Sequence, residues 1–154
     1  MELDPSKMGD SEQIDAETNL LQLQLTCQKI FSVVLKSANQ GFPVEFRTIF
    51  IRIDECMMQK FGSDEASFKA IGGFFFLRFV CPAITAPHVY GLLDHPPNNL
   101  TQRQLVLISK VIQSVANMAV PGKKEKYMEA LASFISSGIP KIVNFYKQIR
   151  VRIN

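Results

Sequence analysis

The sequence predicts an all-α protein of about six helices, and three observations support this fold class. Apolar residues recur three and four positions apart over most of the 154 residues. Proline and glycine divide the chain into segments of helical length, and the one apolar run that could be a strand has no second strand to pair with. The length suits one domain, and an apolar content of 47% is enough for a sizeable core.

The first two predicted helices span residues 15–36 and 43–61. Gly41 suits the end of the first helix, and Pro43 suits the first turn of the second. Gly62 then ends the second helix, and Ser63 and Asp64 offer a cap for the next one. The apolar stripes of these two helices contain Leu20, Leu23, Cys27, Ile30, Phe31 and Val34, then Phe46, Ile49, Phe50, Ile53, Met57 and Phe61.

Residues 65–80 form the most apolar segment, which favours a central helix with neighbours on several faces. A buried strand is the alternative for so short an aromatic run. The adjacent Gly72 and Gly73 would allow another helix to approach closely. We expect Pro82 and Pro87 to end this helix.

The remaining helices are predicted at 101–118, 124–136 and 140–152, after an irregular connection over residues 85–99. Thr101 with Gln104 matches a capping box, which would begin the first of the three. Pro140 suits the first turn of the last one.

Charge is distributed unevenly along the chain, although the net charge is only +3. Residues 1–20 carry six acids and one base, whereas residues 101–154 carry nine Lys or Arg and two acids. This asymmetry suggests that the C-terminal part faces an acidic protein surface, anionic lipid or nucleic acid, and ordinary solvated helix faces are the alternative. Nucleic acid is the weakest of these partners, because no binding motif accompanies the basic residues.

Cysteine usage and the N-terminal segment bear on the compartment. Three widely separated cysteines in apolar surroundings indicate reduced thiols, as in the cytosol. The acidic N-terminal segment does not resemble a signal peptide. Arg78 and Pro82 interrupt the best candidate for a membrane helix, so we expect none.

Most enzyme sites find no support in the sequence. His88 and His95 have no cysteine at zinc-ligand spacing, so we expect no metal site. The stretch 122–124 lacks the leading glycine and the hydroxyl of a phosphate loop. Cys81 precedes a proline in an apolar setting, where a thiol is unreactive.

Arg78 is the exception, because it is the only charge between Lys69 and Asp94. An unpaired buried guanidinium is very costly, so this side chain must reach water or find acceptors. It could extend to the surface or pair with a structural carboxylate. Alternatively, its donors could hold carbonyl groups or a carboxylate in place at a working site.

Four segments of the chain resemble Ras-type GTPase-activating domains, the family that includes neurofibromin. Residues 76–84, Phe-Leu-Arg-Phe-Val-Cys-Pro-Ala-Ile, are similar to the family's FLR…PA motif. Residues 107–117 resemble its Lys…Gln-Ser/Asn…Ala-Asn helix, and residues 124–128 resemble its Lys-Glu…Met segment. Residues 1–7 resemble the stretch that precedes the second half of the catalytic domain.

The resemblance implies an activator that docks a GTP-bound Ras-family GTPase, not an enzyme with its own catalytic centre. The partner would bind Mg-GTP, and the chain would need no cofactor. Arg78 would brace the loop that carries the family's arginine finger. Leu77 would contact the GTPase switch region. The remaining residues implied to line the docking groove are Pro82, Ala83, Lys110, Asn117 and Lys124.

The resemblance also implies what the chain lacks. The family's arginine finger lies upstream of these motifs, so residues 1–154 would be one partial domain, its C-terminal half, with weak activity alone. A non-catalytic GTPase-binding module is the alternative. We expect a cytoplasmic protein that meets membranes only through its partner. A half-domain would also expose apolar surface around residues 74–76.

Overall fold

The computed structural model describes residues 13–119 and 131–152, and this part of the chain is helical with no strand. The predicted all-α class is therefore confirmed. Because α3, η3 and α4 run on without a break, the described residues form five helical rods. Their elements are α1 (Gln13–Ser37), α2 (Val44–Phe61), α3 (Asp64–Phe75), η3 (Phe76–Val80), α4 (Cys81–Thr85), α5 (Asn99–Ala116) and α7 (Ala132–Ile149).

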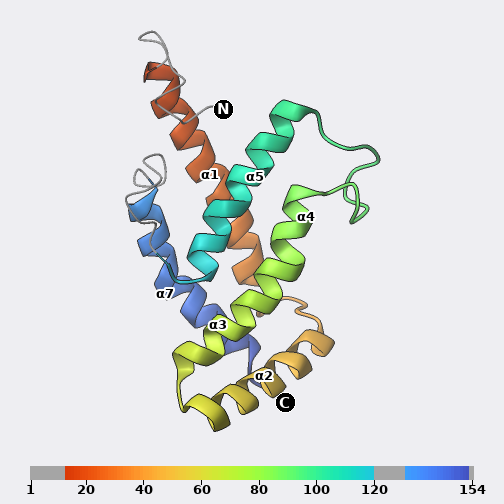
Figure 1. The fold of residues 1–154 in the computed structure, drawn as a ribbon, viewed down its shortest axis with the longest axis vertical. Coiled ribbons are helices and arrows are strands. Elements are labelled where there is room, and N and C mark those ends of the chain that lie inside the picture. Colours follow the sequence, from red (N-terminus) through yellow and green to blue (C-terminus); the bar gives the residue numbers. More distant parts are fainter. Residues whose placement is uncertain (1–12, 120–130, 153–154) are drawn as a thin grey trace.

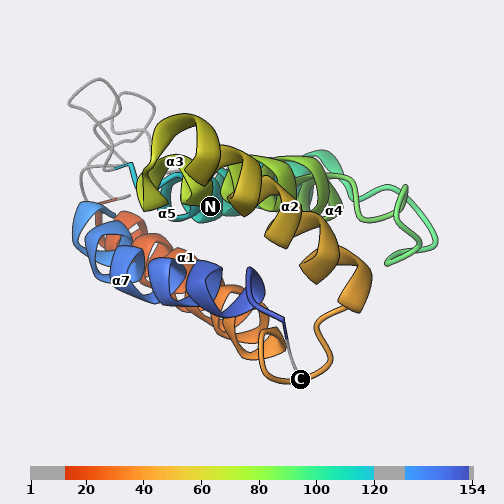
Figure 2. The same cartoon turned by 90° about the horizontal axis from the view of Figure 1, so that it is seen from below.

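The rods pack in two layers (Figure 2). Helices α1 and α7 lie side by side in one layer, and the α3–η3–α4 rod and α5 form the other. Helix α2 packs against α3 and flanks the second layer (Figure 1). The core fills the space between the layers with aromatic and β-branched side chains, among which Phe50, Phe76, Phe145 and Tyr146 are the largest that are fully buried.

The predicted boundaries of α2 are nearly correct. Pro43 is the N-cap residue and not part of the first turn, and it makes no side-chain capping hydrogen bond. Gly62 ends the helix in the left-handed conformation at φ 60°, where a residue without Cβ meets no steric penalty. The hydroxyl of Ser63 then accepts a hydrogen bond from the N–H of Ala66 and caps α3.

The prediction that the apolar helix ends at Pro82 is wrong. The rod passes through this proline by changing to a π-helical turn over η3, where the N–H of Cys81 reaches back to the carbonyl oxygen of Phe76. Proline has no N–H, and its ring clashes with the carbonyl four residues earlier, so a wider turn before it relieves both problems. The helix ends only at Thr85, ahead of Pro87.

Helix α5 begins at Asn99, two residues earlier than expected. The predicted cap at Thr101 is wrong, because the side chain of Asn98 is the cap and accepts a hydrogen bond of 2.9 Å from the N–H of Thr101. Asparagine caps a helix as well as threonine does, so the pattern alone allowed either start.

The chain from Ala132 to Ile149 is one helix, whereas we predicted a helix that ends at residue 136 and another that begins at Pro140. Pro140 lies inside α7. An internal proline costs about 3 kcal/mol, but the apolar stripe on both sides of it is buried in the core, which offsets this cost. Residues 124–130, which belong to the helix predicted at 124–136, lie outside the described residues.

The expected close approach occurs at Gly72 but not at Gly73. A Cβ atom at Gly72 would lie 3.0 Å from the carbonyl oxygen of Ala116 and would collide with the hydroxyl of Tyr146. A Cβ at Gly73 would meet no atom within 4 Å. The first glycine therefore allows α3 to pack closely on α5 and α7.

The rod Asp64–Thr85 is long and apolar enough to cross a membrane by composition alone. Within the described residues it packs against α2, α5 and α7, and 28% of its most apolar stretch is buried. Phe76 in this rod is fully buried, and Phe74 and Phe75 are partly buried. The predicted apolar exposure is therefore not found at residues 74–76 themselves, but the neighbouring Leu77 and Phe79 are exposed.

Candidate functional site

The π-helical turn brings three consecutive side chains to the surface. Leu77 is 43% exposed, Phe79 is 39% exposed, and Arg78 between them is exposed as well. Phe76 and Cys81, on either side of this group, are buried. π-helical turns are rare and frequently lie at functional sites, so this turn marks η3 as the first part of a candidate site.

Arg78 is exposed to solvent, not buried among the phenylalanines that surround it in the sequence. Of the two interpretations left open, the structure agrees with the one in which its side chain reaches the surface. Among the described residues, its guanidinium has no hydrogen-bond or ion-pair partner. Its five N–H donors are therefore available to acceptors outside the described part of the chain.

The buried arginine is Arg47 on α2, which is 5% exposed. Its Nη1 donates a hydrogen bond of 2.7 Å to the carbonyl oxygen of Gln148, and its Nη2 donates to the carbonyl oxygen of Ala38. The guanidinium also lies 5.4 Å from the ring centre of Phe42. Arg47 thus joins α2 to the ends of α1 and α7. One signal in the sequence could have found it, since it lies on the apolar stripe three residues before Phe50.

Pro82 and Ala83 lie on α4 and are half-buried, because α4 packs along α5. Two polar contacts connect these helices. The Sγ of Cys81 lies 3.7 Å from the carbonyl oxygen of Ser109, and the Nε2 of Gln102 donates a hydrogen bond of 2.7 Å to the carbonyl oxygen of Thr85. Burial raises the pKa of the Cys81 thiol, which agrees with an unreactive role.

Lys110 and Asn117 are exposed on α5 and lie seven residues apart, so they share one face of the helix. Asn117 is the C-cap residue of α5, where its backbone N–H bonds the carbonyl oxygen of Gln113. The exposed Arg103 lies seven residues before Lys110 and belongs to the same face. Arg103 is not among the residues predicted to line the groove, and its spacing of seven residues from Lys110 is the signal that indicates the shared face.

The candidate residues thus lie on two neighbouring rods. Leu77, Arg78, Pro82 and Ala83 are on η3 and α4, and the exposed face of α5 carries Lys110 with Asn117 (Figure 1). Lys124 lies outside the described residues. Among the described residues, no three metal-ligating side chains gather as a metal site requires.

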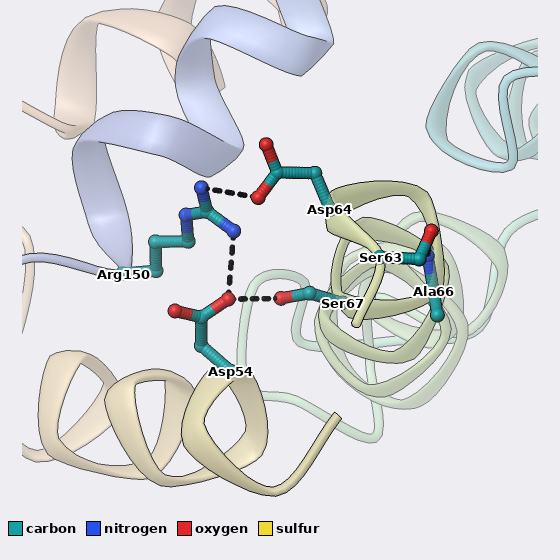
Figure 3. A network of polar contacts seen from close by, with 6 residues as sticks. All are labelled: Asp54, Ser63, Asp64, Ala66, Ser67 and Arg150. Carbon is teal, nitrogen blue, oxygen red and sulfur yellow. Dashed lines mark hydrogen bonds and ion pairs between the residues drawn. The ribbon is translucent and has the colours of Figure 1, made fainter. Parts of the chain in front are cut away.

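A second polar cluster lies at the opposite end of the α3–η3–α4 rod (Figure 3). Arg150 donates hydrogen bonds of 2.7 Å to Asp54 and to Asp64, and the hydroxyl of Ser67 donates one of 2.5 Å to Asp54. The guanidinium lies 4.8 Å from the ring centre of Phe68. All of its polar partners are protein groups on α2 and α3, so this cluster ties the end of α7 to those helices.

Comparison with known proteins matches residues 2–117 to the family described as GTPase-activator protein for Ras-like GTPase. The chain belongs to this family. The match includes the candidate residues on η3, α4 and α5, and it ends at Asn117, before Lys124.

Curated members of the Ras GTPase-activator family are similar over most of this chain. The human Ras GTPase-activating protein nGAP is 37% identical over 134 residues, which are 87% of this chain and 11% of that protein. A probable Ras GTPase-activating-like protein of Dictyostelium discoideum is 34% identical over 94% of this chain and 16% of its own length. Human Ras GTPase-activating protein 1 is 30% identical over 96% of this chain and 14% of its own length. The chain therefore spans a small part of these relatives.

Proposed function

We propose that this chain docks a GTP-bound Ras-type GTPase and forms the C-terminal half of a domain that activates GTP hydrolysis. The exposure of Leu77 and Arg78 at the π-helical turn, inside the family match, carries this proposal. The partner GTPase binds Mg-GTP and contributes the catalytic centre, so the chain needs no cofactor of its own.

The docking groove would run between the α4 rod and α5. Leu77 offers an apolar contact to the GTPase switch region, and Pro82 and Ala83 form the adjoining wall. Lys110, Asn117 and Lys124 line the other side, where the lysines attract acidic switch residues. Contacts of this kind raise the rate of association more than they add to affinity.

Arg78 would brace the loop that carries the arginine finger. Its exposed guanidinium, without an acceptor among the described residues, fits this role, because the acceptors would lie on that loop. A guanidinium can bond several carbonyl groups at once and hold a loop in one conformation.

The finger itself is the part that we propose this chain lacks. A finger must reach into the partner from a protruding loop, but two of the described arginines are held within the fold. Arg47 bonds backbone carbonyl groups, and Arg150 lies between two carboxylates. Arg52 and Arg103 are exposed, but they lie inside α2 and α5 and not on a loop.

Single-turnover GTP hydrolysis by a Ras-type GTPase, with this chain added in excess, tests the division of roles. In the Ras system itself, a finger supplied in trans contributes about 10³–10⁵ in rate, a magnitude taken from that system. We expect stimulation by this chain to fall short of a complete domain by most of that factor. Stimulation equal to that of a complete domain would contradict the finger assignment.

A non-catalytic binding module is the second candidate. It is favoured because Arg47 and Arg150 are bonded within the fold and cannot act as a finger. Titration against the GTPase loaded with a GTP analogue or with GDP separates the two functions. Descent from an activator predicts tighter binding to the GTP-like state. Equal affinity for both states would support a general scaffold that does not sense the nucleotide.

A further inference from the structure

A hollow of about 470 Å³ lies where the first turns of α2 meet the end of α7. It is separate from the proposed docking groove and shares no residue with it. Three of its lining residues are arginines, and none is acidic. The lining residues are Phe42, Val44, Arg47, Thr48, Ile51, Arg52 and Arg152. A concave site with this charge favours an anionic ligand.

The N-terminus of α2 adds to this positive potential. Pro43 occupies the N-cap position and provides no side-chain acceptor for the first-turn N–H groups. Such N–H groups, together with the positive end of the helix dipole, form a ready site for anions. Val44, the first residue of the helix, lines the hollow and is 67% exposed.

Arg47 provides an independent observation. Only 5% of its surface is exposed, and its two hydrogen-bond partners among the described residues are neutral carbonyl oxygens. Its Nε has no acceptor among the described residues. A buried guanidinium whose charge is not neutralised is costly, so an anion in the hollow beside it would offset that cost.

Arg52 and Arg152 complete the site from its exposed rim. Arg52 donates to Glu55 across 2.7 Å, but both side chains are solvent-exposed. Exposed pairs of this kind contribute about 0–1 kcal/mol, so Arg52 can exchange this partner for a ligand at little cost.

We propose that this hollow binds an organic phosphate monoester. Three guanidinium groups match the two negative charges that a monoester carries near neutral pH, and arginine bonds phosphate oxygens in pairs. The hollow is larger than a phosphate group, and Phe42, Val44 and Ile51 provide apolar walls for the attached carbon skeleton. The same chemistry belongs to soluble monoesters and to lipid headgroups.

Two binding measurements on the full chain distinguish these sources. Calorimetry with phenyl phosphate tests a soluble monoester, with phenyl sulfate as the control of lower charge. Co-sedimentation with phosphatidylcholine vesicles that contain phosphatidate tests a lipid monoester, with phosphatidylserine vesicles as the control. Binding in the first arm assigns a soluble ester, binding in the second alone assigns a lipid, and both results support the proposal.

The variants Arg52→Gln and Arg152→Gln remove exposed charges, so the fold should tolerate them. We expect each to weaken binding about tenfold, the effect of losing a charge-assisted hydrogen bond. Lys29→Gln, which removes an exposed charge on α1, should leave binding unchanged. The proposal is overturned by no binding in either arm, by equal binding to the sulfate or phosphatidylserine controls, or by unchanged affinity in both arginine variants. GTPase stimulation has no bearing on these outcomes.

Discussion

The hydroxyl of Tyr146 on α7 donates a hydrogen bond of 2.7 Å to the carbonyl oxygen of Ala116 on α5. Gly72 on α3 lies against both groups, so three helices meet at this point. Ala116 immediately precedes Asn117, one of the proposed docking residues. This contact therefore fixes the end of α5 that the proposed groove uses.

Replacement of Gly72 by alanine should destabilise the fold. The new methyl group would collide with the Tyr146 hydroxyl and press on the Ala116 carbonyl, and overpacking of this kind costs about 1–3 kcal/mol. Urea unfolding measures the loss. Gly73→Ala is the matched control, because its methyl group meets open space and alanine favours a helix over glycine by about 1 kcal/mol. Equal destabilisation by both changes would contradict the close contact.

Removal of the Arg150 side chain should also lower stability. In Arg150→Met, the carboxylates of Asp54 and Asp64 lose their shared cation, and Asp54 is only 23% exposed. Because the cluster is partly solvated, we expect a loss of about 1–3 kcal/mol, below the cost of breaking a fully buried pair. Arg52→Met, which breaks an exposed pair, should change the free energy of unfolding by less than about 0.5 kcal/mol. Similar losses of stability in both variants would contradict the proposal that Arg150 stabilises the packing of α7 against α2 and α3.

The sequence predicted the helical class and the first two helices well, but it failed at two prolines. Pro82 and Pro140 both lie inside helices that we expected to end or begin there. The cost of an internal proline is local, whereas the apolar surface that the continued helix buries is contributed by distant segments. A local sequence pattern contains the cost of the proline but not the apolar burial, so it could not predict that the helix continues.

The sequence did not show which arginine is buried, for a related reason. Arg78 has phenylalanines as sequence neighbours, yet the π-helical turn leaves it exposed. Arg47 lies in a less apolar segment, and its carbonyl acceptors, on Ala38 and Gln148, are 9 and 101 residues away in sequence. Burial depends on these long-range contacts, so the motif was recognisable from sequence but the environment of its arginine was not.

Stability should fall as the pH rises above about 9. Burial raises the pKa of the Cys27 thiol from 9.0 to about 12. The folded state therefore keeps this proton while the unfolded state loses it, so the stabilisation is complete below pH 9 and is lost progressively toward pH 12. Urea unfolding at several pH values between 8 and 10.5 measures how the free energy of unfolding depends on pH. This range is chosen because the thiol of the unfolded chain ionises within it.

The variant Cys27→Ala isolates this contribution. It should lower the free energy of unfolding at pH 8, because it leaves a cavity at a fully buried position. It should also reduce the dependence on pH between about 9 and 10, where Cys81 still contributes because burial raises the pKa of its thiol as well. Above pH 10 a slope should remain, because burial also raises the pKa of Tyr146. An unchanged slope between pH 9 and 10 would show that the Cys27 thiol ionises equally in both states.

Leu77 gives the most direct test of the proposed docking surface. Because it is 43% exposed, Leu77→Ala should change stability little, yet it removes the apolar contact that we assign to the GTPase switch region. Truncation of an apolar contact residue costs about 1–2 kcal/mol of binding, which is roughly five- to thirtyfold in affinity for the GTP-loaded GTPase. Leu21→Ala, on α1 in the other layer and 54% exposed, is the matched control and should bind as the wild type does. A loss of affinity in Leu77→Ala but not in Leu21→Ala is the result expected from direct contact of Leu77 with the GTPase. If the two variants bind equally well, the surface formed by η3 is not the docking site.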